Sequence, residues 1–417
     1  MHSTLPRAVE GASGQRGPFP LPLVGRDAEV AALGTWLEDA AASRGGTTLL
    51  AGVGGVGKTR LVGAIAERAA RQGWTVTVGR AYPVETGVPY AVFADALTAV
   101  LRGLTPAALA VMTRGDAATL ANICPAFSTT APAPASREGG DVKSRLHWSF
   151  AQFLGQLAAQ QPILLVLENL QWADSSSLEL LHFVARHMGG ERVALLCTYN
   201  ETELDANPTL RATEQSLLSL GAARLMRLEP LTADALQELV REAFHADAAS
   251  ARALAGRLYS WTRGNPFFVE EVLKALVESG ALHEQNGSWL GWEAELPGLP
   301  RSIRDAVTAR VNRLGAAART IANLAAVIGT RTSHDALVAV SGLTESDVLT
   351  ALDELRAQNA VSEEVQSDGA ITYEFAHPLV RDVLYGELGI ARGRLLHATV
   401  AEALETLYGA DAAAHAD

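Results

Sequence analysis

The chain has little of several residue types, and each shortage excludes a class of protein. Its only cysteines, Cys124 and Cys197, are too few for a disulfide framework or a structural zinc set. Aromatic residues make up 6% of the chain and hydrophobic residues 48%, which disfavours an aromatic-rich β-protein. No run approaches the roughly 18 consecutive apolar residues that cross a membrane, and residues 1–20 contain no apolar segment typical of a signal peptide. We therefore expect a cytoplasmic protein that does not bind a membrane.

The chain also has no excess of positive charge. Its 46 acidic and 34 basic side chains give a formal net charge of −12. A negative balance of this size disfavours broad electrostatic binding to a nucleic-acid backbone, although it leaves a local basic face open.

What the chain does contain is an alternation of short apolar runs with helical patterns. The runs span residues 47–53, 74–79, 163–168, 193–199 and 224–228. This alternation is typical of a parallel sheet with helices on both faces. The length of 417 residues allows several domains of about 100–200 residues each. We predict an α/β domain followed by helical regions.

A glycine-rich motif follows the first apolar run and precedes a helical pattern. It has the form GxxxxGK[ST], whose glycines let backbone N–H groups approach phosphate oxygens at a helix N-terminus. Its lysine is expected to neutralise the β- and γ-phosphates, and its threonine hydroxyl to bind Mg²⁺. The motif consists of Gly52, Val53, Gly54, Gly55, Val56, Gly57, Lys58 and Thr59. The sequence therefore predicts a P-loop site for a nucleoside triphosphate.

An acidic residue ends the apolar run 163–168, where a P-loop protein needs a carboxylate beside the magnesium ion. Glu168 supplies that carboxylate and is followed by Asn169. The alternative is that Glu168 merely ends a buried strand, but the P-loop upstream and the motif 171–174 (QWAD) favour a metal site. We therefore expect Thr59 and Glu168 to hold Mg²⁺.

The pattern of elements also predicts the order of domains. The α/β part ends near residue 230, a wholly helical stretch follows, and two strand-like runs flanking Gln-Ser-Asp-Gly after three helical segments suggest a winged helix. The predicted parts are a flexible tail 1–20, a P-loop domain 21–230 with a loop or lid at 125–141, a helical subdomain 231–285, a linker 286–299, a winged-helix domain 300–390, and a C-terminal helix and tail 391–417.

Several motifs in order resemble the STAND class of signal-transduction ATPases. They are Val24-Gly25-Arg26, the P-loop, the segments 167–174 (LENLQWAD), 198–201 (TYNE) and 264–271 (GNPFFVEE), and the segment 375–381 (FAHPLVR). More narrowly, residues 22–405 resemble the origin-recognition-like AAA ATPase module (AAA_16 type) of large ATP-binding bacterial regulators. In that family the module occurs beside LuxR-type or SARP-type DNA-binding domains or nucleotide cyclases.

The resemblance implies that the nucleotide is ATP or ADP with Mg²⁺, and it assigns further residues to the nucleotide. Val24 to Arg26 would lie against the adenine, Pro266 would pack on the base, and His377 would reach the β-phosphate of ADP. The alternative for His377 is a capping or packing residue before Pro378. The candidate nucleotide-binding residues outside the P-loop are Val24, Gly25, Arg26, Arg60, Asn200, Pro266 and His377.

Two departures from the family pattern bear on catalysis by the candidate residues Lys58, Glu168 and Asn169. The family usually has Asp-Asp where this chain has Glu168-Asn169, and an arginine where this chain has Asn200. Asn169 is neutral and cannot accept a proton from an attacking water, and Asn200 removes a positive charge near the γ-phosphate. We therefore expect weak or absent ATP hydrolysis. Two other acids in these segments, Glu201 and Asp174, are the alternative bases.

Three functions remain open from the sequence. The first is a switch ATPase closed by ADP, which regulates transcription or another output through a domain or partner outside this chain. The second is a DNA-binding ATPase, but residues 301–400 contain ten arginines, no lysine and twelve acidic residues, so we expect no direct nucleic-acid binding. The third is a nucleotide-binding scaffold without turnover. We expect a fragment or module of a larger system, with nucleotide-dependent oligomers as one mode of action.

Overall fold

The computed structural model of the chain has two compact units. Among the residues that the structure describes, the first unit comprises residues 25–229, and the second comprises residues 230–409 together with residues 21–24. The described residues are 21–128, 141–285, 288–293, 300–329, 331–358, 360–366, 370–376 and 378–409. The predicted tail 1–20, most of the predicted lid 125–141 and His377 lie outside them.

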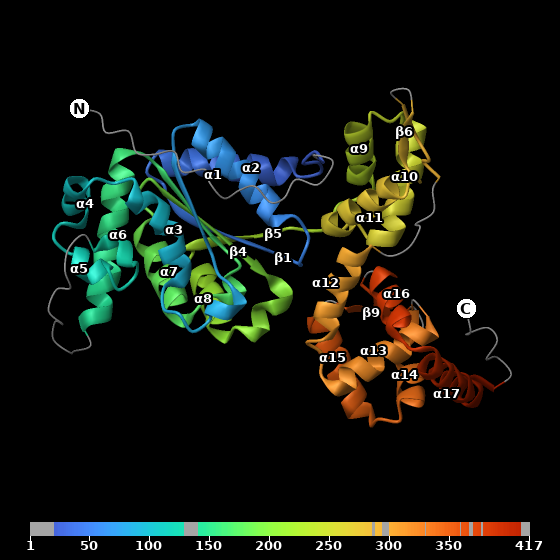
Figure 1. Cartoon of the computed structure of the whole chain (residues 1–417). Helices are drawn as coiled ribbons and strands as arrows, with labels where there is room; N and C mark the ends of the chain where they lie inside the picture. The colour runs from blue at the N-terminus through green and yellow to red at the C-terminus, as the bar shows by residue number, and fades with distance from the viewer. Residues whose placement is uncertain are drawn as a thin grey trace. The chain divides into compact units, whose positions relative to one another are not determined.

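The first unit is built on a parallel sheet of five strands in the order β2-β3-β4-β1-β5 (Figure 1). Every residue of β3 is buried, which explains its unbroken apolar sequence, because a central parallel strand is covered on both faces. The predicted α/β fold with a parallel sheet is thus confirmed. The strands are β1 Gly46–Gly52, β2 Thr75–Arg80, β3 Ile163–Glu168, β4 Val193–Asn200 and β5 Ala223–Arg227.

Helices cover the two faces of this sheet. Alternate residues of a strand point to opposite faces, and Leu165 and Leu195 share a hydrophobic core with helices α3, α6, α7 and α8. Helices α1 and α2 contact β4 and β3 respectively. The helices are α1 Asp27–Ala41, α2 Lys58–Arg71, α3 Ala91–Arg102, α4 Pro106–Thr113, α5 Ala117–Leu120, α6 Asp141–Gln160, α7 Ser175–His187 and α8 Pro208–Ser219, with 3₁₀ turns η1 Pro83–Glu85, η2 Pro125–Phe127, η3 Leu170–Trp172 and η4 Glu201–Ala206.

The start of the segment predicted as a lid is held by one buried side chain between exposed residues. Phe127, in η2, is fully buried and meets Phe153 of α6 edge to face, with ring centroids 4.9 Å apart. Residues 129–140 lie outside the described part, so the lid itself stays a prediction.

The second unit begins with three helices, as the helical pattern predicted. They are α9 Ala233–Phe244, α10 Ala248–Thr262 and α11 Pro266–Glu278. A short antiparallel pair follows, β6 His283–Gln285 and β7 Ser288–Leu290, which the sequence did not predict because β7 falls in the expected linker 286–299. Trp289 of β7 packs edge to face on Phe244, so this hairpin is attached to the helical part.

The rest of the second unit contains the helices and the hairpin on which the winged-helix prediction rested. Strands β9 and β10 pair antiparallel, and β8 adds a third strand in the order β8-β10-β9. Strand β8 and helix α14 were not predicted. The elements are α12 Arg301–Val311, α13 Ala316–Ile328, β8 Arg331–Ser333, α14 His334–Ser341, α15 Glu345–Ala357, β9 Val361–Val365, β10 Ile371–Phe375, α16 Pro378–Glu387 and α17 Ile390–Tyr408.

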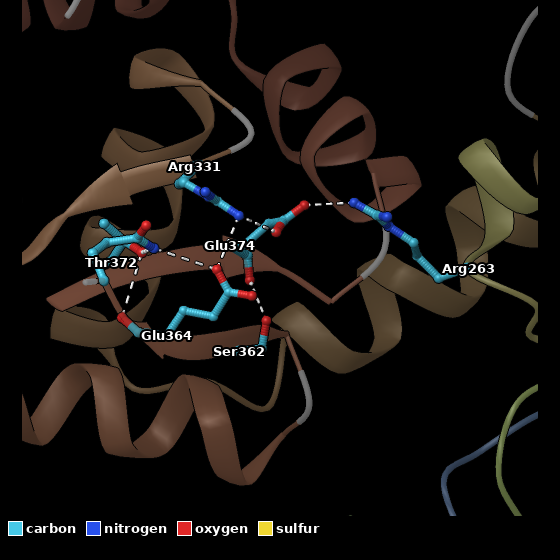
Figure 2. Close-up of polar contacts among 7 residues, drawn as sticks. Arg263, Arg331, Ser362, Glu364, Thr372 and Glu374 are labelled. Carbon is cyan, nitrogen blue, oxygen red and sulfur yellow. Dashed lines mark hydrogen bonds and ion pairs between the residues drawn. The ribbon is translucent and has the colours of Figure 1, made fainter.

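An ion-pair network on this small sheet reaches the helical part of the same unit (Figure 2). Arg331 Nη2 lies 2.9 Å from a carboxylate oxygen of Glu364 and 3.3 Å from one of Glu374. The other oxygen of Glu374 lies 2.5 Å from Nη2 of Arg263, which directly follows α10. Exposed pairs are weak singly, but this network joins α10 to β10 and β8.

No helix in the described ranges is long and apolar enough to span a bilayer.

Candidate functional site

The P-loop has a backbone shape that requires glycine. Gly55 and Gly57 have φ values of 84° and 101°, in the left-handed region that other residues rarely adopt. A Cβ on Gly52 would lie 2.7 Å from the carbonyl oxygen of Leu228. The loop thus connects the end of β1 to the first residue of α2, Lys58, and the dipole at a helix N-terminus favours an anion there.

Lys58 lies over the loop that precedes it. Its Nζ donates hydrogen bonds to the carbonyl oxygens of Gly52 at 2.6 Å and Val53 at 3.1 Å. These bonds hold the ammonium group at the loop. Thr59 and Arg60, the next residues of the first turn of α2, are exposed.

Arg26 braces the P-loop from behind. It is only 5% exposed, and its Nη2 donates to the carbonyl oxygens of Val56 at 3.2 Å and Glu229 at 2.6 Å. Burial lowers the pKa of this guanidinium, partly offset by the charge of Glu29, whose Oε1 lies 3.5 Å from Nη1. These contacts give Arg26 a structural task that the family resemblance does not assign.

Val24 and Gly25 belong to different compact units. Val24 is buried in the hydrophobic core of the second unit, whereas Gly25, with a φ of 63°, begins the first unit. A role for either residue at the adenine therefore stays a prediction.

Glu168 ends β3 with one oxygen paired and one unpaired. The residue is 2% exposed, and its Oε2 accepts a hydrogen bond from Arg80 Nε at 2.7 Å. Its Oε1 is buried and has no hydrogen-bond partner among the described residues. A buried carboxylate oxygen without a partner is costly and suits a cation or its bound water.

The residues at this edge of the sheet fit Mg²⁺. Only β4 separates β3 from β1, so Glu168 ends about 10 Å from the P-loop strand at ordinary strand spacing. Thr59 offers an exposed hydroxyl at the start of α2, and Glu168 offers a free carboxylate oxygen. Oxygen ligands in small number, completed by water and phosphate, are what Mg²⁺ prefers in nucleotide sites.

Asn169 has the left-handed conformation, with a φ of 62°. Its N–H donates to Thr198 Oγ1 at 3.3 Å, and it precedes the turn η3. Asparagine tolerates this conformation better than most residues. The side chain is neutral whichever way it points.

Asn200 ends β4 beside the P-loop, where it pairs in register with Gly52. Its amide group is engaged by the following turn η4. Nδ2 donates to Glu203 Oε1 at 3.1 Å, and Oδ1 accepts from the N–H and hydroxyl of Thr202 at 3.4 and 3.0 Å. Asn200 thus shapes the exit of β4.

A polar network that the sequence did not reveal joins the exits of β3 and β4. Gln171 Oε1 accepts from the N–H of Asn200 at 3.0 Å, and Trp172 Nε1 donates to Glu203 Oε2 at 2.9 Å. Asn207 Nδ2 donates to the carbonyl oxygen of Gln171 at 3.2 Å. The motif 171–174 therefore holds the ends of β3 and β4 together. The sequence marked this motif only through its resemblance to a known family, without indicating these contacts.

The two alternative bases differ in their surroundings. Asp174 caps helix α7, because its Oδ1 accepts from the N–H of Ser177 at 2.9 Å and its Oδ2 from the Ser177 hydroxyl. Burial raises the pKa of Glu201, with a further rise from Glu229 and an opposing effect from Arg227 and then Lys58. Of the two, Glu201 is the acid whose charge interacts with the P-loop lysine.

The motif Gly264-Asn265-Pro266 has a local structural reason. Gly264 has a φ of 78°, and a Cβ there would lie 1.9 Å from the carbonyl oxygen of Leu231. Asn265 Oδ1 accepts from the N–H of Phe267 at 3.1 Å and caps α11, whose first residue is Pro266. Pro266 belongs to the second unit, and His377 lies outside the described residues, so their nucleotide contacts stay predictions.

Similar proteins include one curated relative and several solved structures. An uncharacterized protein of Rhizobium meliloti (strain 1021) is 24% identical over 403 residues, covering 90% of this chain but only 36% of its own length. The chain thus spans about a third of that relative.

The solved structures resemble the chain at low identity. They include a STAND protein with a tetratricopeptide repeat sensor from Pyrococcus horikoshii (12% identity, TM-score 0.36, covering 98% of this chain and 49% of that one). They also include Drosophila ORC bound to DNA (13% identity, TM-score 0.40, covering 89% of this chain and 88% of that one). A RuvB variant from Thermotoga maritima is a further example (16% identity, TM-score 0.38, covering 84% of this chain and 92% of that one).

The family match is more specific than these likenesses. The AAA ATPase domain family matches residues 22–196, which contain the P-loop, Glu168 and the first half of β4. This match confirms that residues 22–196 resemble an AAA ATPase domain, as the sequence motifs indicated.

Proposed function

We propose that the chain is an ATP- and ADP-binding switch of the STAND type, which hydrolyses ATP slowly and regulates an output domain or partner. One observation carries this proposal: a complete phosphate-binding loop stands beside a buried carboxylate with a free oxygen, followed by a neutral residue instead of a second acid. The first two features support Mg²⁺-nucleotide binding, and the third supports slow turnover.

Nucleotide binding would use groups that the P-loop already presents. Backbone N–H groups of the P-loop would donate to phosphate oxygens, and Lys58 would exchange its loop carbonyls for the β- and γ-phosphates. Thr59 and Glu168 would hold Mg²⁺, which neutralises phosphate charge when bound. Arg26 would keep the loop in this shape through Val56.

Slow hydrolysis follows from the residues beyond the carboxylate. Asn169 cannot take a proton from an attacking water, and Asn200 is neutral and engaged by its own turn. Glu201, whose charge interacts with that of Lys58, is the remaining acid and would act as a weak base.

The switch itself would couple the nucleotide to the second unit. ADP held by the P-loop, Pro266 and His377 would favour a closed state, and exchange for ATP would open it. A ligand shifts such an equilibrium only if its affinity differs between the two states, and a His377 contact made in one state supplies that difference. Transcription regulation and nucleotide-dependent oligomers are the outputs that this proposal favours.

Equilibrium binding of fluorescent ATP and ADP analogues to the full chain tests the proposal. We expect binding that strengthens with Mg²⁺ and that falls at least about tenfold in Lys58→Ala, because that variant loses a charged contact to phosphate. Lys143→Ala, which removes an exposed lysine paired with Glu179, is the matched control. A wild-type chain that binds neither nucleotide at millimolar concentration would refute the proposal.

The non-hydrolysing scaffold is the second candidate, and Asn169 favours it. A single-turnover assay with radiolabelled ATP separates the two: product above the buffer blank indicates the switch ATPase, and none indicates the scaffold. Direct DNA binding has weaker support, because α15 carries four acidic residues and one arginine. Salt-dependent retention of duplex DNA would revive it.

A further inference from the structure

Arg80 is a charged residue at the candidate site that the sequence motifs do not include. It ends β2 and pairs in register with Glu168, the last residue of β3. Its Nε donates to Glu168 Oε2 at 2.7 Å, and the two residues are 88 positions apart in the chain. The pair therefore exists only because the sheet places β2 beside β3.

The backbone of Arg80 is fixed by its neighbours. Helix α3 approaches β2 so closely that a Cβ on Gly79 would lie 1.9 Å from the carbonyl oxygen of Val92. The N–H of Arg80 donates to Asp95 Oδ2, in the same helix, at 2.9 Å. The guanidinium thus reaches Glu168 from a strand end that is held in place by two contacts.

We propose that Arg80 is a positioning residue of the metal site: it holds Oε2 of Glu168 and leaves Oε1 for the Mg²⁺ of a bound nucleotide. This inference rests on the proposed function. Arg80 would not touch the nucleotide, and its effect would pass through Glu168.

The unequal treatment of the two carboxylate oxygens supports a role beyond structure. A carboxylate buried only to stabilise the fold normally has both oxygens satisfied, because an unpartnered buried oxygen is costly. Glu168 is 2% exposed and has a partner on one oxygen alone among the described residues. One arginine compensates the buried charge and one acceptor stays open, which is the arrangement a cation ligand requires.

The length of the Glu168 side chain suits this pair. The carboxylate of residue 168 must meet Arg80 on one side and a metal-bound oxygen on the other. Aspartate is shorter by one methylene and would retract both oxygens toward β3. Glu168 and Arg80 are therefore expected to act together, so that Glu168→Asp weakens the same property as loss of the arginine.

The test is the strengthening of nucleotide binding by Mg²⁺, measured as the ratio of the dissociation constant in EDTA to that in Mg²⁺. The full chain is titrated with a fluorescent ADP analogue in both buffers. For Arg80→Gln we expect this ratio to fall about tenfold, because a hydrogen bond to a charged group is lost from the metal ligand. The dissociation constant in EDTA should stay within about twofold, because the P-loop is untouched.

Two further variants keep the test interpretable. Arg80→Lys retains one positive donor and should give a ratio between those of the wild type and Arg80→Gln; it carries the test if Arg80→Gln does not fold. Arg71→Gln removes an arginine that is 73% exposed and 3.9 Å from Glu67, and it should leave the ratio unchanged.

The outcomes separate this inference from the proposed function. A wild type that binds ADP with a Mg²⁺ effect that survives in Arg80→Gln overturns the role of Arg80 alone. Equal weakening in EDTA and in Mg²⁺ indicates a purely structural ion pair and also overturns it. A wild type without nucleotide binding overturns the proposed function, and the role of Arg80 with it.

Discussion

Replacing Arg26 by methionine tests whether the P-loop is braced by this residue. Methionine keeps an apolar stem of similar length, so the change removes mainly the guanidinium. It leaves the carbonyl oxygens of Val56 and Glu229 without their donor in a position that is 5% exposed. Each hydrogen bond to a charged group contributes about 1.5 kcal/mol or more, so we expect a loss of about 3 kcal/mol in the free energy of unfolding of the first unit.

The assay combines a global and a local measurement. Urea unfolding followed by circular dichroism reports the free energy of unfolding, and hydrogen exchange of residues 46–71 reports the P-loop and α2. Arg44→Met is the control, because Arg44 is 68% exposed and paired only at the surface with Asp39, which predicts a change below about 0.5 kcal/mol. If Arg26→Met leaves both measurements unchanged while ADP affinity falls, Arg26 contacts the nucleotide and is not a brace.

Three other perturbations test the packing and charges. Gly264→Ala should lower the melting temperature of the second unit, because its Cβ would meet Leu231 1.9 Å away at a φ of 78°; an unchanged melt would contradict this. Arg263→Glu should destabilise the unit by under about 1 kcal/mol at low salt, and the swap with Glu374→Arg should restore it, as a double-mutant cycle by urea unfolding would reveal. Glu201→Gln should stabilise the chain slightly at pH 7 but not at a pH below 4.5, the ordinary pKa of this carboxyl group. The fold raises the pKa of Glu201, and a raised pKa costs stability only at a pH where the side chain of the unfolded chain is ionised. Urea denaturation at both pH values tests this expectation.

The sequence predicted the parts of the site that depend on local pattern. The P-loop was identifiable because its glycines serve a backbone shape that other residues rarely adopt, and Gly55 and Gly57 have that shape. The parallel sheet was predicted because buried strands such as β3 are unbroken apolar runs. Glu168 was predicted at a strand end because it ends an apolar run. It was predicted near the P-loop because the carboxyl ends of parallel strands meet at the same edge of a sheet.

The parts that escaped prediction depend on contacts between distant segments. Arg80 ends a strand that has no motif, and its pairing with Glu168 requires that β2 lies beside β3. Glu203 could not be predicted because its hydrogen bond with Trp172 depends on how the turn after β4 is placed. Strand β8 is three residues long, too short for an alternating pattern, and it takes its place by pairing with β10.

The conformation of Asn169 changes how its neutrality should be interpreted. A φ of 62° favours asparagine, so the residue has a conformational reason to be there besides any catalytic one. Aspartate also tolerates the left-handed region, which means that Asn169→Asp changes the chemistry at this position while preserving its backbone. A faster single turnover in that variant would therefore report a missing base and not a repaired fold. An unchanged rate would place the limit elsewhere, at Asn200 or at the closing of the switch.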